Sequence, residues 1–154
     1  MTPPLPARPW PAWLLALLFL GYAAGKAVFA VQGRLGFPGG PPVSAEEAAA
    51  YFLEPGPAQG LAALSGLLGA CVVLATVTPP GRRIPRRVLL AALGVLALAT
   101  GGGAGIMILD GFLGLGVGWR WYHGLLGVVV LALLVETVRR YVRKVPVRTI
   151  QIGT

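Results

Sequence analysis

The sequence predicts an all-α fold, a membrane-embedded four-helix bundle with a short extracytoplasmic helix between its first and second spans. Hydrophobic residues make up 56% of the 154 residues and charged residues only 12%, whereas a soluble domain carries about 25% charged residues. The apolar residues gather in four segments, each near the length of about 20 residues that crosses a hydrocarbon core about 30 Å thick. Basic residues flank these segments, so the net charge of +8 indicates membrane topology and not nucleic-acid binding.

The first predicted span covers residues 12–31 and is interrupted only by Lys26. A cleaved signal peptide is the alternative, because its apolar core is typically about 7–15 residues long. We expect a retained span, since apolar residues resume directly after Lys26. The other predicted spans cover residues 58–77, 88–109 and 121–138. Together with a basic tail over residues 139–154, they form one integral membrane domain over residues 1–154.

The connection between the first two spans predicts a turn and a short helix. Its glycine- and proline-rich start covers residues 36–42. Ser44 and Glu47 then have the spacing of a capping box, in which each side chain bonds the other residue's backbone amide. We expect the helix to continue to about Leu53 and to stop at Pro55-Gly56-Pro57. The short loop after the second span predicts that the second and third spans pack as antiparallel neighbours.

The distribution of charge predicts the orientation. Acidic residues outside the predicted spans lie on one side, at Glu46, Glu47, Glu54 and Asp110. The other side carries Arg8, Arg82, Arg83, Arg86, Arg87, Arg139, Arg140, Arg143, Lys144 and Arg148. Because basic loops remain cytoplasmic, we expect both termini inside the cell, in a multi-pass protein of the cell membrane. Anionic lipid headgroups are the expected partner of the tail, at about 1 kcal/mol per residue, with a cytoplasmic acidic protein as the alternative.

Small residues four apart allow helix backbones to approach closely in a membrane, where burying leucine drives no association. Glycines with this spacing, or with an alanine partner, are Gly21, Gly25, Gly66, Gly101 and Gly105. Packing within one chain and self-association into a homo-oligomer or larger membrane complex both remain open. Cys71 is the single cysteine, and we expect it to be a small buried apolar residue.

Lys26 is the most unusual polar residue, because an ionisable side chain inside a span is costly and is a candidate for function. It can snorkel toward the surface, pair with Asp110, or belong to an outward-facing ligand site. The candidate ligand-binding residues are Lys26, Asp110, Arg120 and His123, which all lie near the same boundary. Glu136 precedes Arg139 and Arg140 by three and four residues, the spacing of ion pairs on one helix surface.

The sequence offers no set of residues for catalysis or metal binding. His123 is the only histidine and Ser44 and Ser65 are the only serines. A metal or haem site would lack its further ligands, and a serine triad has no readable arrangement. We therefore predict no catalytic residue, no metal and no cofactor. The arginine, glycine, proline and alanine content is typical of a GC-rich bacterial genome.

Residues 25–40, GKAVFAVQGRLGFPGG, place a polar residue before aromatic residues, a glycine turn and a proline. This stretch resembles the end of the first helix in small uncharacterised bacterial four-helix membrane proteins, and the overall plan resembles DoxX-like proteins. The resemblance implies the four-helix fold and, for DoxX-like proteins, quinone or redox partners; it implies no catalytic residue.

Two hypotheses about function follow. The first is a non-enzymatic accessory or self-associating membrane subunit, indicated by the packing glycines and the missing catalytic set. The second is a transporter or enzyme that handles a small molecule or lipid at the polar site around Lys26 and Asp110. The position of Lys26 separates them: a cavity shared with Asp110 favours the second, and a side chain directed toward the headgroups favours the first.

Overall fold

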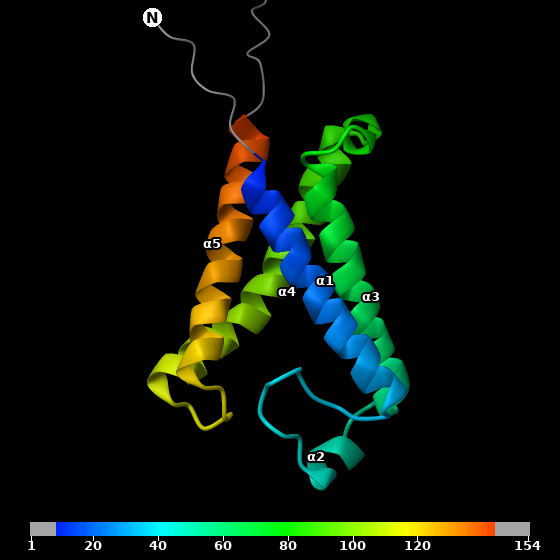
Figure 1. The fold of residues 1–154 in the computed structure, drawn as a ribbon, viewed down its shortest axis with the longest axis vertical. Helices are drawn as coiled ribbons and strands as arrows, with labels where there is room; N and C mark the ends of the chain where they lie inside the picture. Colours follow the sequence, from blue (N-terminus) through cyan, green and yellow to red (C-terminus); the bar gives the residue numbers. More distant parts are fainter. Residues whose placement is uncertain (1–8, 144–154) are drawn as a thin grey trace, which may run out of the picture.

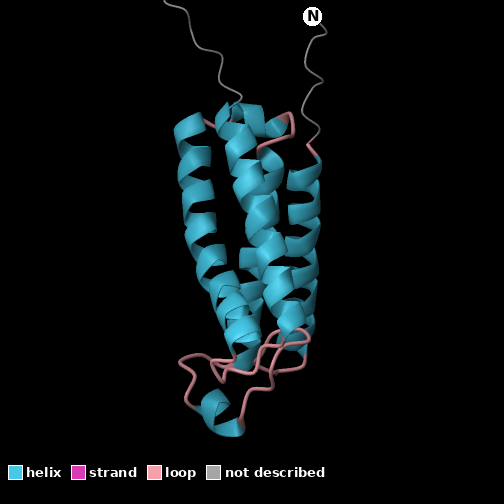
Figure 2. Ribbon diagram, turned by 90° about the vertical axis from the view of Figure 1, so that its left-hand side faces the viewer, coloured by secondary structure: helices cyan, strands magenta, loops and turns pink. Residues whose placement is uncertain are grey.

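The computed structural model describes residues 9–143, and in this range it is helical without strands, as the sequence predicts (Figure 1). The elements are α1 (Trp10–Val31), α2 (Ala45–Ala49), α3 (Pro55–Ala75), the 3-10 helix η1 (Pro80–Arg83), α4 (Arg86–Leu113) and α5 (Trp121–Arg143). Both ends of the described chain and η1 lie at one end of the bundle, which we call the terminal end. We call the opposite end, with α2 and the remaining loops, the loop end (Figure 2). Arg8, Lys144, Arg148 and most of the predicted basic tail lie outside the described residues.

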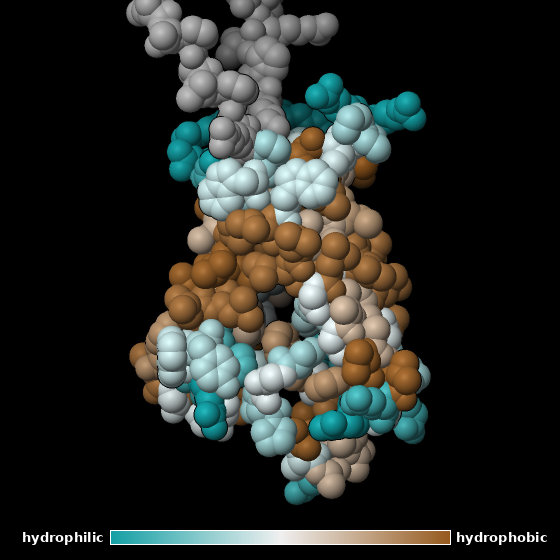
Figure 3. Space-filling view, in the orientation of Figure 1, coloured by the Kyte–Doolittle hydropathy of each residue, from teal (hydrophilic) through white to brown (hydrophobic). Residues whose placement is uncertain are grey.

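The long helices α1, α3, α4 and α5 are long and apolar enough to cross a membrane. Their outer surface forms a broad hydrophobic band between more polar ends (Figure 3). Large apolar side chains are exposed in this band, including Leu98 on α4, which is 81% exposed. A water-soluble monomer rarely exposes so much contiguous apolar surface. The chain is therefore a multi-pass membrane protein with lipid as the solvent of its surface.

Prolines mark where the spans begin. Pro55 is the first residue of α3, three residues before the predicted start, and α4 begins directly after Pro85. The first turn of a helix leaves its amides unpaired, so a residue without an N–H group is tolerated there. Pro55-Gly56-Pro57 therefore starts the next span in addition to separating it from α2.

The predicted capping box at α2 is confirmed. The amide of Glu47 donates to the Ser44 hydroxyl at 3.2 Å, and the amide of Ser44 donates to the Glu47 carboxylate at 2.8 Å. These bonds from Ser44 lower the pKa of Glu47 from its ordinary value. The helix ends at Ala49, before the predicted Leu53, and the rings of Tyr51 and Phe52 then lie 4.9 Å apart.

The bundle consists of two closely packed helix pairs, α1 with α3 and α4 with α5. They meet in the terminal half, where the buried core consists of Ala12, Leu15 and Ala16 of α1, Ala70 and Val73 of α3, and Leu134 of α5. Toward the loop end the two pairs diverge, with α1 and α3 on one side and α4 and α5 on the other (Figure 1). The prediction that the second and third spans are close neighbours holds only locally, because the interface of α3 with α4 is much smaller than that of α1 with α3 or of α4 with α5.

Some glycines allow the two helices of a pair to approach closely, and other glycines do not have this role. A β-carbon on Gly66 of α3 would lie 2.8 Å from the Tyr22 ring and 3.1 Å from the Phe19 carbonyl oxygen of α1. A β-carbon on Gly127 of α5 would lie 2.9 Å from the Ala104 carbonyl oxygen of α4. At these positions the helix backbones approach too closely for any side chain.

The other predicted packing glycines have different surroundings. A β-carbon on Gly25 would collide with the Pro38 ring, so Gly25 receives a loop and not a helix. At Gly21, Gly101 and Gly105 a β-carbon would meet no atom within 4 Å. Cys71 is a free, exposed residue of α3, and the expectation that it is buried is wrong, because its face of α3 points away from both neighbouring helices.

We expect Gly66→Ala to destabilise the bundle by about 1–3 kcal/mol, the usual cost of overpacking a close contact. Gly60→Ala is the matched control on the same helix, since its β-carbon would meet no atom within 4 Å. Thermal unfolding in detergent, followed by circular dichroism, measures both. Equal midpoints for the two variants would contradict the close α1–α3 contact.

Candidate functional site

The loop that follows α1 crosses the opening between the two helix pairs. We call residues 33–43 the bridging loop, and Figure 1 shows it between the diverging pairs at the loop end. The surface above it is hollowed (Figure 3). Gly36 and Gly39 have positive φ angles of 138° and 72°, a backbone region that favours glycine. These two residues present their carbonyl oxygens to opposite sides of the opening.

Lys26 and Gln59 bind the same carbonyl oxygen on one side of the loop. The Lys26 ammonium donates to the Gly36 oxygen at 2.6 Å, and the Gln59 amide donates to it at 3.1 Å. Gln59 is only 4% exposed, and its Oε1 atom has no hydrogen-bond partner. The two side chains thereby attach the loop to the α1–α3 pair.

Aromatic rings surround this contact. The Lys26 Nζ atom lies 5.5 Å from the centre of the Tyr22 ring and 5.8 Å from that of the Phe37 ring, distances at which a cation is attracted to a ring face. Phe37 in turn meets the edge of Trp119 at 5.2 Å between ring centres. We call Tyr22, Lys26, Phe37, Gln59, Trp119 and His123 the loop-end cluster.

His123 attaches the loop to the other helix pair. Its Nδ1 atom accepts the Arg120 amide at 3.2 Å, so the proton of the neutral ring is on Nε2. Nε2 then donates to the Gly39 carbonyl oxygen at 2.8 Å. Lys26 and His123 thus hold carbonyls that are three residues apart in one loop.

Asp110 binds a different segment. Its carboxylate accepts the amide of Val117 at 3.1 Å and that of Trp119 at 2.6 Å. It is 2% exposed and lies in the last turn of α4, where it orders the loop to α5. Among residues 9–143, the ion pairs are those of Glu136. The sequence-based pairing of Lys26 with Asp110 is therefore wrong, because each side chain is held by the backbone of its own neighbouring loop.

Of the predicted ligand-binding residues, the structure brings Lys26 and His123 to one loop, places Asp110 beneath the next loop, and leaves Arg120 exposed. The sequence reasoning missed Phe37 and the carbonyls of Gly36 and Gly39. The glycine-rich turn was the available signal, since glycine allows the backbone to present its carbonyl groups closely.

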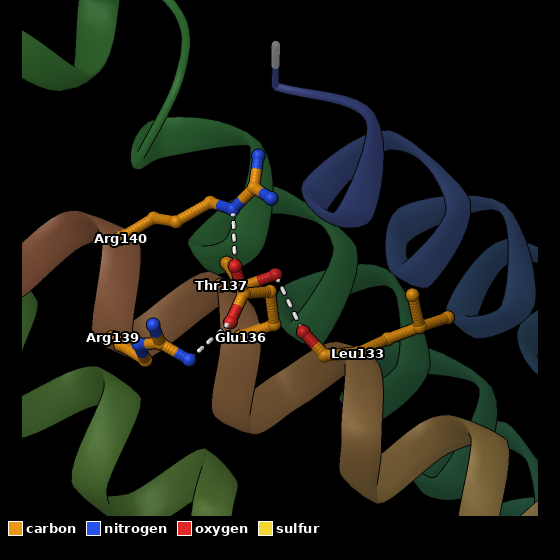
Figure 4. Close-up of polar contacts among 5 residues, drawn as sticks. All are labelled: Leu133, Glu136, Thr137, Arg139 and Arg140. Atoms are coloured by element: carbon orange, nitrogen blue, oxygen red, sulfur yellow. Dashed lines mark hydrogen bonds and ion pairs between the residues drawn. The ribbon is translucent and has the colours of Figure 1, made fainter. Parts of the chain in front are cut away.

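A second polar group lies at the terminal end, on the surface of α5 (Figure 4). Glu136 accepts from Arg140 at 2.6 Å and pairs with Arg139 at 3.4 Å, as the spacing predicts. The Arg140 guanidinium also lies 5.9 Å from the centre of the Trp10 ring of α1. The Thr137 hydroxyl donates to the Leu133 carbonyl of the same helix at 2.7 Å.

Among residues 9–143, no group of three His, Cys, Asp or Glu side chains is placed to hold a metal ion. No family model, curated protein or solved structure matches this chain. The contacts of the loop-end cluster itself indicate its chemistry. Most of its polar atoms bind loop backbone, which is an arrangement that orders loops.

We expect Asp110→Ala to release the loop between α4 and α5, because two backbone amides lose an ionised acceptor worth about 1.5–3 kcal/mol each. Hydrogen exchange at the Val117 and Trp119 amides should accelerate strongly. Asp110→Asn keeps one oxygen acceptor and turns an NH₂ group toward the other amide, so exchange should accelerate at only one of the two amides. Unchanged exchange in the alanine variant would contradict the role of Asp110.

Proposed function

We propose that this protein is a non-enzymatic membrane subunit that associates with a second copy of itself through α4. The observation that carries the non-enzymatic part is the partner of Lys26. Its ammonium is directed to the Gly36 carbonyl of the bridging loop, and Asp110 is occupied by the amides of another loop. In the described part of the chain the two side chains thus serve different loops, which supports a structural role for both over a shared transport or catalytic site.

The open glycines of α4 support association. Gly101, Gly102, Gly103 and Gly105 have no atom within 4 Å of an added β-carbon, whereas Gly66 and Gly127 are closed by neighbouring helices. Each glycine lowers the stability of a helix by about 0.5–1 kcal/mol relative to alanine. At these positions of α4, no close contact among the described residues offsets that cost. Close approach of another helix would supply the missing contacts.

The proposed orientation has the terminal end in the cytoplasm of a bacterial cell. Arg82 and Arg83 of η1, Arg86 and Arg87 of α4, and Arg139, Arg140 and Arg143 of α5 all belong to this end. Basic segments beside spans remain on the cytoplasmic side and attract anionic headgroups there. The loop end, with the capped helix α2, then faces outward.

Association is tested with Gly102→Leu, which should reduce dimerisation strongly because a leucine holds the two helix backbones apart. Energy transfer between labelled copies in liposomes measures it. Gly21→Leu is the matched control, since Gly21 is equally open but lies on α1. A monomeric parent chain that recovers no stoichiometric partner from mild detergent would contradict the proposal. Loss of association in the control variant alone would assign the contact to α1.

Orientation is tested by cysteine labelling in a Cys71→Ser background, which leaves the chain without a thiol. A cysteine at Glu46 should react with an impermeant maleimide on intact cells. A cysteine at Arg83 should react only after the cells are permeabilised. The reverse pattern would contradict cytoplasmic termini.

A further inference from the structure

Lys26 carries a charge that the described residues do not neutralise. Its contacts are one carbonyl oxygen, at 2.6 Å from Nζ, and two aromatic rings. An ammonium has three N–H donors, so two remain after the bond to Gly36. A charge at membrane depth is costly unless an opposite charge or strong acceptors accompany it. The site therefore favours an anion.

Gln59 carries a free hydrogen-bond acceptor, whereas Lys26 carries free donors. Its Oε1 atom is a buried acceptor without a partner, and a buried polar group without a hydrogen bond destabilises the fold. The amide orientation is settled by Gly36, because only the NH₂ group can donate to that carbonyl oxygen. A ligand hydroxyl or a water molecule that reaches Oε1 would supply the missing hydrogen bond.

Lys26 and Gln59 bind one and the same oxygen atom, so the ammonium with its free donors and the amide group that carries the free acceptor meet at this atom. We propose that together they bind a phosphate ester that also carries a free hydroxyl, the headgroup of one anionic lipid. The phosphate accepts from Lys26, and the hydroxyl donates to Gln59 Oε1. This inference does not depend on association through α4.

The position of the pair favours a lipid over a soluble phosphate ester. Lys26 lies five residues before the end of α1 at Val31, or about 8 Å along the helix axis at about 1.5 Å per residue, which places it near the end of an apolar span, where lipid headgroups are within reach of a long side chain. A recess of about 530 Å³ lies beside the cluster and is lined by Phe37 and Arg34, but not by Lys26 or Gln59. Arg34 is therefore separate from the pair that holds the Gly36 carbonyl.

The lipid headgroups differ in what they offer this pair. A phosphatidylglycerol headgroup has both the anion and the hydroxyl. Phosphatidylmethanol has the anion alone, and phosphatidylcholine has no hydrogen-bond donor and no net charge. Phosphatidylethanolamine can donate, but its ammonium would lie beside that of Lys26.

The experiment measures lipid bound to the full chain by native mass spectrometry after exchange into each lipid. We expect phosphatidylglycerol to be preferred over phosphatidylmethanol about fivefold, the effect of one hydrogen bond. Over phosphatidylcholine we expect about tenfold or more, because its phosphate can also accept from Lys26 but it lacks the hydroxyl and brings a trimethylammonium group beside the Lys26 ammonium. Soluble glycerol phosphate should not displace the lipid. This comparison needs no variant and is decisive by itself: equal binding of phosphatidylglycerol and phosphatidylmethanol, or a preference for phosphatidylethanolamine, overturns the proposal.

Variants test which residue causes the preference for the headgroup hydroxyl and which causes the preference for the anion. Gln59→Met should abolish the preference for the hydroxyl and keep that for the anion. Lys26→Met should abolish the preference for the anion, and Lys26→Arg should retain it. Arg34→Met removes an exposed cation from the same end of the chain and should change neither. An equal loss in the Arg34 and Lys26 variants would show general surface attraction and overturn the site, and displacement by glycerol phosphate would show a soluble ligand and overturn the lipid assignment.

Discussion

Peptide groups at membrane depth must find their hydrogen-bond partners inside the protein, because hydrocarbon offers none. The four long helices meet this constraint through their own backbone. In the bridging loop, which lies beyond the end of α1, side chains from both helix pairs bind the backbone: Lys26 and Gln59 hold the Gly36 carbonyl and His123 holds that of Gly39. Asp110 does the same for two amides of the next loop. The polar residues that resemble a reactive site thus mostly serve as hydrogen-bond partners of the loop backbone.

The loop is needed at this place because the helices pack as two pairs. Glycines let α3 approach α1 and α5 approach α4 until backbone and ring atoms are in contact, whereas the two pairs share their apolar core only in the terminal half. At the loop end, hydrogen bonds and ring contacts across the bridging loop join them. α4 also carries glycines of the kind that allow such close approach, and among residues 9–143 no helix covers Gly101, Gly102, Gly103 or Gly105.

The two ends of the molecule use charge differently. At the terminal end, Glu136 accompanies its arginines on an exposed helix surface, where such pairs contribute little to stability. At the loop end, Lys26 is half-buried among rings without a carboxylate. Lys26 with its uncompensated charge and Gln59 with its unpaired Oε1 both bind the Gly36 oxygen, and these features distinguish the cluster from an ordinary polar fringe.

The sequence by itself determined the features that depend on neighbours along the chain: the four apolar segments, the capping box at Ser44 and Glu47, and the pairing of Glu136 with Arg139 and Arg140. Each involves residues within one or a few helical turns, so spacing alone specifies the contact. The tertiary structure decided which helices pair, which glycines are closed, and what Lys26 binds. The physical reason is that Lys26 binds a backbone carbonyl, a group that every residue has. Only the path of the loop determines which carbonyl reaches the ammonium.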